Sequence, residues 1–516
     1  MSYTSVKEMN DFFQDKRKLK DHIERLECDK KFYPNSVNEL LATESRWKKY
    51  PPLYRSMKDD FTRLKDLLIE DSKKIYPEKP KNMEQLMKMR EKIQTNPLEE
   101  IVIESKESRQ QKNDEACNQI LQKMQSSFQK TPALIHAFYD SQGLVGEYEN
   151  RELLIYGALS RTNMGIESIA GSGKSALLYA FLKAIPEKEY STIHQSTGKA
   201  FYNNPAINNA RIWVIPELQK IFSQDAEEII KNLTEGVSIT HTRTNKNRDG
   251  VDTFEITPKT IFYSFAITNK HLKYRDDEFY RRFVILHTDI RKEQNNNVAK
   301  HYAQTDFSSS EQSNTPKRLL EHHLKICFAS EAIVKNPFLE SIIESFPQEI
   351  KGHVRFRSSV KYLQSLTKGK TLYEQSTLNQ EPFLFSSLSD AVDILSLYQH
   401  TLIMNLHGIN SIEAGLLQVL EKNPEGSTFE EVQKKFREEY LASFPCSEII
   451  EKLTDQELIK KEKDRFFVIP FPKSSFSPEN LLEKASTLMK KEYPKEHDRW
   501  YELSLKNLTS TGDKRL

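Results

Sequence analysis

The sequence lacks several features that mark particular classes of protein, and each absence argues against one class. Its four cysteines lie far apart and form no CxxC pair, which argues against a disulfide framework and against a cysteine-based zinc site. A reducing cytoplasm fits this cysteine usage. No apolar run reaches about 18 residues, and the first residues lack the apolar core of a signal peptide. We therefore expect neither a membrane span nor a secretory leader.

The chain also has little excess charge of either sign. It contains 76 lysines and arginines and 74 aspartates and glutamates, a net charge of +2. This balance gives no general attraction to nucleic acid, so any such binding must come from local basic patches. The length of 516 residues is enough for several domains, each with its own core.

Glycine is absent from residues 1–130, which are polar and rich in lysine and glutamate. Apolar residues recur there at helical spacing, as at Leu64, Leu67 and Leu68, and predict an all-helical region. Its charge runs are typical of solvated helix faces. The region carries no motif that indicates chemistry, and a collar for oligomerisation or a docking site for other replication proteins are both possible roles.

From residue 135 the pattern changes to apolar, β-rich runs that alternate with helical ones. Buried strands are predicted at 166–169, 212–215, 260–266 and 283–286, with a helix at 176–185. This alternation predicts a three-layer α/β domain with a parallel sheet. The fold class is therefore multidomain α/β. We predict a helical region at 1–130, a P-loop ATPase core with a helical lid at 135–370, a connector at 371–410, a winged helix at 411–472 and a polar tail at 473–516.

The segment 168–175, here called the glycine loop, carries the clearest chemical signal. It lies between a predicted strand and a predicted helix and contains Gly171, Ser172, Gly173, Lys174 and Ser175. Glycines let backbone N–H groups curl around the phosphates of a nucleotide, the lysine adds a positive charge, and the serine hydroxyl binds Mg²⁺. Ser168 stands where the usual pattern has a first glycine. The loop predicts binding of ATP with Mg²⁺.

A second strand should end in carboxylates beside such a loop, and the run 211–217 is the best candidate. It ends in Pro216-Glu217, whereas ring ATPases usually place two acids here. Glu217 is the candidate general base, and it is also a candidate for the Mg²⁺ shell. Pro216 replaces the first acid, which favours slower hydrolysis; a strand-end glutamate without a catalytic role is the alternative.

Two further groups follow the pattern of a ring ATPase. Asn269, after the third strand, is placed to position the attacking water. Arg281 or Arg282, just before the last strand, is placed to reach a neighbouring subunit's nucleotide as an arginine finger, and the sequence does not choose between them. A surface pair of arginines without function is the alternative.

The segment 237–256 predicts a β-hairpin because two alternating runs flank a polar turn with Asp-Gly. Arg243, Lys246 and Arg248 in and beside this turn are candidates for contacts with DNA phosphates, although an ordinary solvated hairpin fits as well. Residues 411–471 predict three helices followed by two short strands, the pattern of a winged helix. Lys461 and Arg465 in its wing are further candidates for DNA contact, whereas Glu448, Glu451 and Asp455 make its third helix acidic.

These features together resemble the AAA+-type ATPase module of phage- and plasmid-type DNA primase-helicases. The resemblance covers roughly residues 140–370 and rests on motifs in order: the run from Gly143 to Leu154, the Gly-Lys-Ser loop, the strand ending at Glu217, Glu235-Gly236 before the hairpin, 334–338 and 355–363. It implies a hexameric ATP-driven motor on DNA; superfamily 3 helicases and minichromosome maintenance proteins use a similar hairpin. The zinc-binding and primase regions of that group have no counterpart at 1–130, so priming is not expected.

The sequence therefore predicts an ATP-dependent DNA helicase or translocase of a replication system that acts as a ring. Pro216 keeps a second interpretation open, namely a nucleotide-gated initiator, loader or regulatory protein that hydrolyses ATP slowly or not at all. A small-molecule kinase also uses a glycine loop, but it would need neither the hairpin nor the winged helix.

Overall fold

The computed structural model describes fourteen stretches of the chain, which belong to two compact units, 1–110 and 111–516. The described residues are 18–20, 23, 57–63, 115, 117–120, 131–194, 208–220, 224–244, 251–267, 277–307, 315–376, 381–440, 446–469 and 477–511, with the side chains of a few of them left out. In the first unit the short described pieces are helical and bury Leu19, Met57 and Phe61. Most of the predicted helical region 1–130 lies outside the described residues.

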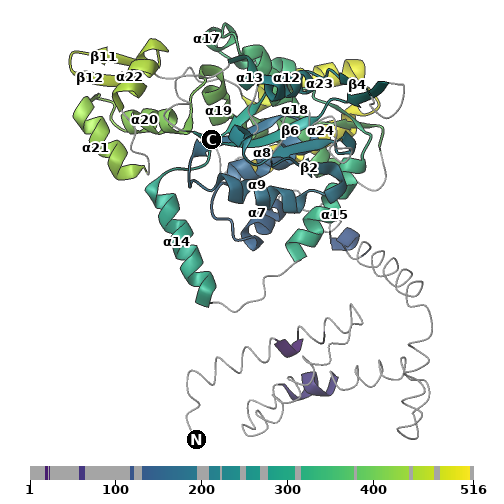
Figure 1. The fold of residues 1–516 in the computed structure, drawn as a ribbon. Coiled ribbons are helices and arrows are strands. Elements are labelled where there is room, and N and C mark those ends of the chain that lie inside the picture. The colour runs from purple at the N-terminus through teal and green to yellow at the C-terminus, as the bar shows by residue number, and fades with distance from the viewer. Residues whose placement is uncertain are drawn as a thin grey trace, which may run out of the picture. The chain divides into compact units, whose positions relative to one another are not determined.

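A five-stranded parallel sheet forms the centre of the larger unit (Figure 1). Its strands, in spatial order, are β2 (Tyr190–Thr192), β3 (Ile212–Ile215), β6 (Thr260–Ile267), β1 (Met164–Ile169) and β7 (Val284–Leu286). The predicted parallel α/β sheet is confirmed, and the short strand β2 is an addition to the prediction. Because all five strands are parallel, their carboxyl ends meet at one edge of the sheet.

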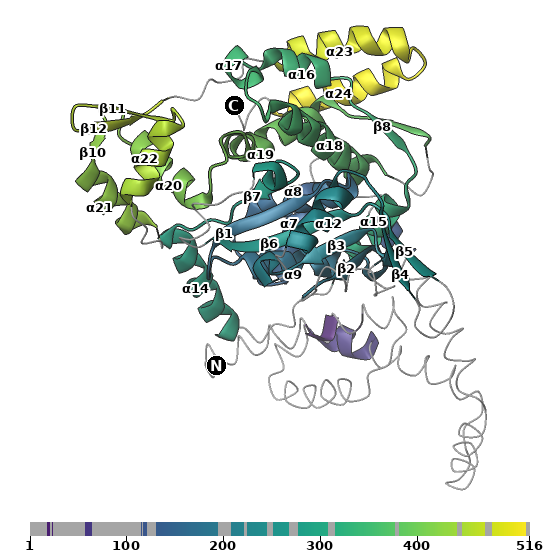
Figure 2. The ribbon, with the colours of Figure 1, turned by 45° about the horizontal axis from the view of Figure 1, so that its top comes forward.

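Helices cover both faces of this sheet (Figure 2). One face packs Ile166 and Phe262 against α9 (Lys174–Ala184), with α8 (Tyr148–Leu159) and α7 (Thr131–Ser141) behind it. The other face buries Trp213 and Tyr263 against α12 (Gln224–Thr234). Alternate residues of each strand thus enter two different cores, which explains why the strands read as continuous apolar runs.

A layer of helices continues the core on the side of α8. It contains α15 (Thr315–Ala329), α16 (Leu339–Ser345), α17 (Gln348–Lys351), α18 (Phe356–Gln375) and α19 (Leu388–His407), with the short parallel strands β8 (Ile333–Lys335) and β9 (Phe383–Phe385). α8 and α18 cross closely at Gly369, where an added Cβ would lie 2.0 Å from the carbonyl oxygen of Tyr156. Half of the segment predicted as a connector, 371–410, is helix α19, which contributes buried residues to this core.

The segment predicted as a polar tail that is helical in part, 473–516, contains two helices, α23 (Pro478–Glu492) and α24 (His497–Thr511). Their apolar side chains enter the main core: Leu481, Leu482, Ala485, Met489 and Trp500. The described part of this segment, 477–511, is thus built into the larger unit. Its described Asp, Glu, Lys and Arg residues are exposed, and these many exposed charges make the sequence polar enough to predict a tail.

Residues 411–469, here called the C-terminal unit, hold three helices and a small antiparallel sheet. The elements are α20 (Ser411–Glu421), β10 (Ser427–Thr428), α21 (Phe429–Glu439), α22 (Cys446–Asp455), β11 (Ile459–Glu462) and β12 (Arg465–Val468). The predicted order of three helices and two strands is confirmed, and β10 adds a third strand. Capping boxes begin α20 at Asn410 and α21 at Thr428, so both helix starts are encoded locally.

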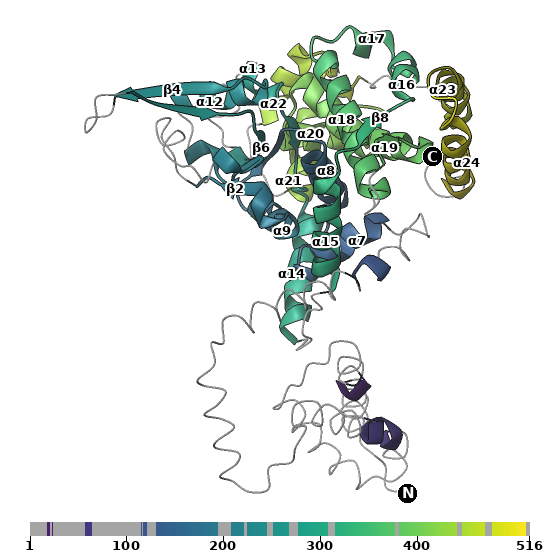
Figure 3. The same cartoon turned by 90° about the vertical axis from the view of Figure 1, so that its right-hand side faces the viewer.

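The predicted β-hairpin is present as β4 (Ile239–Thr244) and β5 (Val251–Ile256), which pair from Ile239 with Ile256 to Thr244 with Val251. It projects away from the sheet (Figure 3). α13 (Asp277–Tyr280) precedes β7, and α14 (Lys292–Phe307) follows it; the 3-10 turns Glu187–Glu189 and Leu218–Lys220 complete the described elements. None of the described helices is long and apolar enough to cross a membrane.

Candidate functional site

The glycine loop connects the carboxyl end of β1 to the start of α9. Gly171 and Gly173 have φ angles of +80° and +87°, and no atom lies within 4 Å of where their Cβ atoms would be. This left-handed conformation favours glycine and turns successive N–H groups toward one side. Helix α9 begins at Lys174, so its first N–H groups have no partner within the helix. The segment is an open loop of the shape that binds anions at a helix start.

Ser168 lies outside this turn. It is a buried residue of β1, and its Oγ is 3.4 Å from the Oγ of Ser411 on α20. The position where the usual pattern has its first glycine thus lies in strand β1. Gly171 and Gly173 form the turn itself. The departure from the usual pattern leaves the shape of the turn intact.

Lys174 is buried at the base of the loop with 7% of its surface exposed. Its Nζ donates hydrogen bonds to the carbonyl oxygen of Ile169 and, over 3.4 Å, to Ser172 Oγ. Burial lowers its pKa to about 8 because removal from water disfavours the charged form. Ser175, the next residue, is exposed. Both predicted phosphate and Mg²⁺ ligands thus stand at the first turn of α9.

Glu217 stands at the same edge of the sheet, just after β3. Its partly exposed carboxylate forms an ion pair with Lys220 one turn later. The preceding carbonyl of Pro216 accepts a hydrogen bond from Ser264 Oγ on β6, which fixes the end of β3 to its neighbour. Asn269, two residues after the end of β6 in the sequence, lies outside the described residues.

The end of β7 adds polar residues that the sequence analysis missed. Thr288 is buried, and its Oγ1 donates to Ser172 Oγ over 2.7 Å. His287 Nδ1 donates to the carbonyl oxygen of Glu167 over 2.9 Å. Their position directly after a predicted strand was the available signal, because polar residues at the carboxyl ends of parallel strands meet at the ligand-binding edge.

The run 143–150, noted for its resemblance to a family motif, is tied to this same segment. Glu147 Oε1 accepts a hydrogen bond from the backbone N–H of Asp289 over 2.8 Å. Asn150 Nδ2 donates to Glu147 Oε2 and to the carbonyl oxygen of His287. Burial raises the pKa of Glu147 to about 7. The run joins the start of α8 to the end of β7, and so supports the glycine loop from the side.

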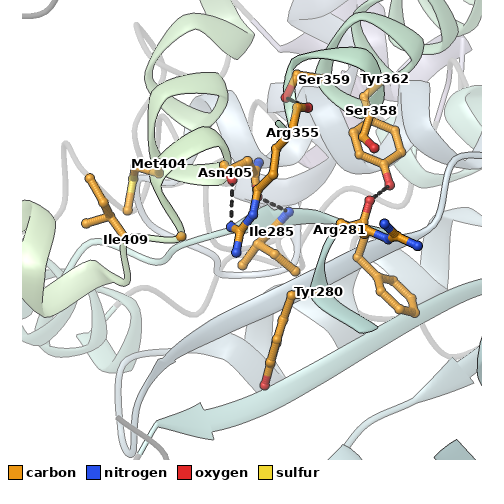
Figure 4. Close-up of a pocket in the computed structure, with 12 residues that line it drawn as sticks. Tyr280, Arg281, Ile285, Arg355, Ser358, Ser359, Tyr362, Met404, Asn405 and Ile409 are labelled. Carbon is orange, nitrogen blue, oxygen red and sulfur yellow. Dashed lines mark hydrogen bonds between the residues drawn. The ribbon is translucent and has the colours of Figure 1, made fainter. Parts of the chain in front are cut away.

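Arg281 and Arg282 differ sharply in their surroundings. The Arg282 side chain is 8% exposed; it donates to the carbonyl oxygen of Lys231 over 2.6 Å and pairs with Glu278 and Glu235 over 2.8 Å. The Arg281 side chain is 52% exposed, and its contact with Glu278 is 3.6 Å long. Arg281 and Arg355 line a pocket beside β7 (Figure 4), and the carbonyl of Arg281 accepts from Tyr362. The Arg282 guanidinium is thus bound by partners in its own chain, whereas the Arg281 side chain is accessible from solvent.

Both arginines precede β7 and so lie toward the amino edge of the sheet. Met164 pairs with Val284 at the start of β7, and the glycine loop follows Ile169 at the other end of β1. Five residues of strand therefore place the loop about 16 Å further along the sheet. Arg281 thus lies toward the opposite edge of the sheet from the glycine loop of its own chain.

The candidate DNA contacts fall in less completely described parts. Lys246 and Arg248 lie outside the described residues, and Arg243 is placed only by its pairing with Asp252 on β5. Lys461 is exposed on β11, with its Nζ 5.5 Å from the centre of the Phe466 ring. Arg465 donates to the carbonyl oxygen of Gly426 over 2.8 Å.

The outward face of α22 is acidic. Glu448, Glu451 and Asp455 are exposed on it, and the nearby Lys452 pairs with the buried Glu413 over 2.7 Å. Exposed positive charge in the C-terminal unit therefore includes Lys461 and Lys463, on and beside β11. Among the residues that the structure describes, no group of three or more His, Cys, Asp or Glu side chains gathers as a metal site.

No protein-family model matches this chain, and no curated protein matches it. The functional interpretation therefore depends on the geometry of the site.

Proposed function

We propose that this protein is an ATP-dependent DNA translocase or helicase that acts as a ring oligomer of the AAA+ type, in a replication system. The observation that carries the proposal is the glycine loop: two left-handed glycines and a helix start at Lys174, at the carboxyl edge of a parallel sheet. Open sheets of this kind bind their ligands at that edge. The positive end of α9 and the lysine suit the β- and γ-phosphates of ATP.

The roles of the side chains follow from their places around this loop. Lys174 binds the phosphates, and the Ser175 hydroxyl holds Mg²⁺, whose remaining ligands are phosphate oxygens and water. Mg²⁺ supplies charge neutralisation on the phosphates. Glu217 acts as the general base that accepts a proton from the attacking water, with Asn269 orienting that water. Glu217 must first exchange its ion pair with Lys220 for the water, because the ion pair occupies the carboxylate.

The opposite placement of Arg281 supports a ring. An exposed arginine toward the amino edge cannot serve the loop of its own chain, but it is accessible to a neighbouring copy's nucleotide. An arginine finger supplied in trans is a known device for phosphate transition states. The hairpin with Arg243, Lys246 and Arg248, and the C-terminal unit as a winged helix, are the proposed DNA contacts. Because the outward face of α22 is acidic, Lys461 in the wing is the proposed DNA contact of this unit.

A second candidate function is a nucleotide-gated initiator, loader or regulatory protein that turns over slowly. Two observations favour it: Pro216 replaces the usual first acid, and Glu217 is held by Lys220. Both functions need ATP at the glycine loop, and they differ in the rate of hydrolysis.

Steady-state ATP hydrolysis with and without forked DNA distinguishes the two candidates. A motor predicts DNA-stimulated turnover that falls about 100-fold in Glu217→Gln, while the exposed control Glu425→Gln keeps the wild-type rate. Tight ATP binding without DNA stimulation, and with no effect of Glu217→Gln, would favour the slow regulatory protein. A chain that stays monomeric with ATP and DNA would contradict the ring.

A further inference from the structure

The C-terminal unit packs directly on the edge of the sheet that carries the glycine loop. Ile267 at the end of β6 and Ile290 after β7 are buried in the unit's own core, and Ile169 at the end of β1 packs against it. Helix α20 begins beside β1, where the hydroxyls of Ser168 and Ser411 are 3.4 Å apart. Figure 2 shows α20 beside β1 and β7. The ends of three strands at the proposed nucleotide site are thus part of this unit's packing.

The segment 288–292 joins the glycine loop to the C-terminal unit by a second route. At one end Thr288 donates to Ser172 in the loop. At the other end Arg291 forms a backbone bridge with Tyr440, and Lys292 Nζ donates to the carbonyl oxygen of Arg437 over 2.6 Å. Asp289 holds the middle by a two-pronged pairing with the Arg291 guanidinium. The five-residue segment therefore reaches from the glycine loop at Thr288 to the C-terminal end of α21 at Arg291 and Lys292.

We propose that the C-terminal unit is a nucleotide-responsive element, coupled to the glycine loop through residues 288–292, which include the buried Ile290, and through the strand ends at Ile169 and Ile267. The proposal rests on the proposed binding of a nucleoside triphosphate at this loop. A bound triphosphate takes hydrogen bonds from Lys174 and the loop amides and holds the ends of β1 and β7 in place. Local opening of the segments that pack on those ends then becomes rarer. Because coupling is reciprocal, the position of the C-terminal unit also sets nucleotide affinity.

This coupling gives the proposed motor a direct link between ATP and DNA. The C-terminal unit carries the wing with Lys461 on its outer side and contacts the strand ends on its inner side. A change at the phosphates is transmitted to the wing across one layer of packed side chains. No motion of the N-terminal region is required.

Amide hydrogen exchange on the full-length chain, with and without a non-hydrolysable Mg·ATP analogue, tests the proposal. We expect amide exchange to slow at least about threefold in the first turn of α9. We expect the same in α20 and at the backbone bridge between Arg291 and Tyr440. Protection of α9 without protection of α20 would overturn the coupling and leave nucleotide binding intact. Protection of neither segment would instead contradict the proposed nucleotide binding.

Two variants remove contacts at the two ends of the segment 288–292. Thr288→Val removes the hydroxyl that donates to Ser172 at nearly constant volume, and Lys292→Met removes the exposed bond to α21. At saturating analogue each should reduce the protection of α20 by about half or more while α9 stays protected. The control Thr367→Val removes a buried hydroxyl that bonds only within α18, to the carbonyl oxygen of Leu363, and should leave both effects unchanged. Thermal unfolding checks that each variant folds. Full protection of α20 in folded Thr288→Val and in folded Lys292→Met would overturn the role of residues 288–292.

Discussion

Thr288 Oγ1 donates a 2.7 Å hydrogen bond to Ser172 Oγ across a sequence separation of 116 residues. The bond ties the last strand of the sheet to the loop that follows the first. Since Thr288 is buried and the same segment contacts the C-terminal unit, the shape of the glycine loop depends on packing at a distance from it. This relationship places the loop, the strand ends and the C-terminal unit in one connected site.

Substitution of the two arginines before β7 should have different effects: one on ATP hydrolysis and the other on stability. Arg281→Ala should leave the thermal midpoint unchanged but reduce ATP hydrolysis about 1000-fold, because its exposed guanidinium makes only a long contact of 3.6 Å with Glu278 and is accessible to a neighbouring copy. Arg282→Ala should lower the free energy of unfolding by about 2 kcal/mol, because three partners lose its guanidinium.

Mixing experiments test whether Arg281 acts between copies. Inactive Arg281→Ala chains mixed with inactive Lys174→Ala chains should regain part of the activity, since some interfaces then pair an intact loop with an intact arginine. Full activity of Arg281→Ala alone would remove this arginine from the site.

The close crossing of α8 and α18 predicts a large effect of one methyl group. Gly369→Ala would place a Cβ against the Tyr156 carbonyl oxygen, and backbone cannot yield as a side chain can, so we expect a loss of about 3 kcal/mol. Gly352→Ala is the matched control, because Gly352 has an ordinary φ of −72° and its Cβ would meet no atom closer than 3.4 Å. Equal midpoints of the two variants in urea unfolding would show that the helices do not cross this closely.

Much of the sheet could be predicted from the sequence because a parallel strand buried on both faces is a short apolar run between turns. β2 was missed since Tyr190–Thr192 is three residues long and only half-buried. α19 was not assigned because apolar residues lie on several of its sides, which hides a helical period. In both cases neighbours across the fold, and not local pattern, decide the structure.

The candidate site divides in the same way. The glycine loop is local, so its turn and helix start were predictable from consecutive residues. The bond between Thr288 and Ser172, and the burial of Arg282 beside an exposed Arg281, depend on contacts between distant segments. Nothing in a pair of adjacent arginines indicates which one the fold will use for itself.

Nucleotide affinity should depend on pH through Lys174. Burial lowers the pKa of this lysine to about 8, and a triphosphate binds its protonated form. The dissociation constant for Mg·ATP should therefore be flat below about pH 7 and rise about tenfold between about pH 7 and pH 9, as the lysine of the free protein loses its proton. Lys174→Arg, which stays charged, should bind without this dependence. If the affinity of the wild type does not change up to pH 9, direct contact between Lys174 and the phosphates is contradicted.

The two basic residues of the wing should have different effects on DNA binding. Lys461→Ala should weaken DNA binding and reduce the slope of log affinity against log salt by about one, with an unchanged thermal midpoint. Arg465→Ala should instead lower the midpoint, because its guanidinium holds the carbonyl oxygen of Gly426. Lys490→Ala, exposed on α23, is the control for general loss of charge. An unchanged salt slope in Lys461→Ala would exclude the wing from the DNA contact.

Calorimetric titration of Mg·ATP into the full-length chain tests the central claim, that a nucleoside triphosphate binds at the glycine loop. The account predicts one site per chain and a loss of affinity of about 100-fold or more in Lys174→Ala. Lys183→Ala, an exposed lysine in the last turn of the same helix, should bind like the wild type. Absence of binding to the wild type, or equal affinity in the Lys174→Ala and Lys183→Ala variants, would contradict it.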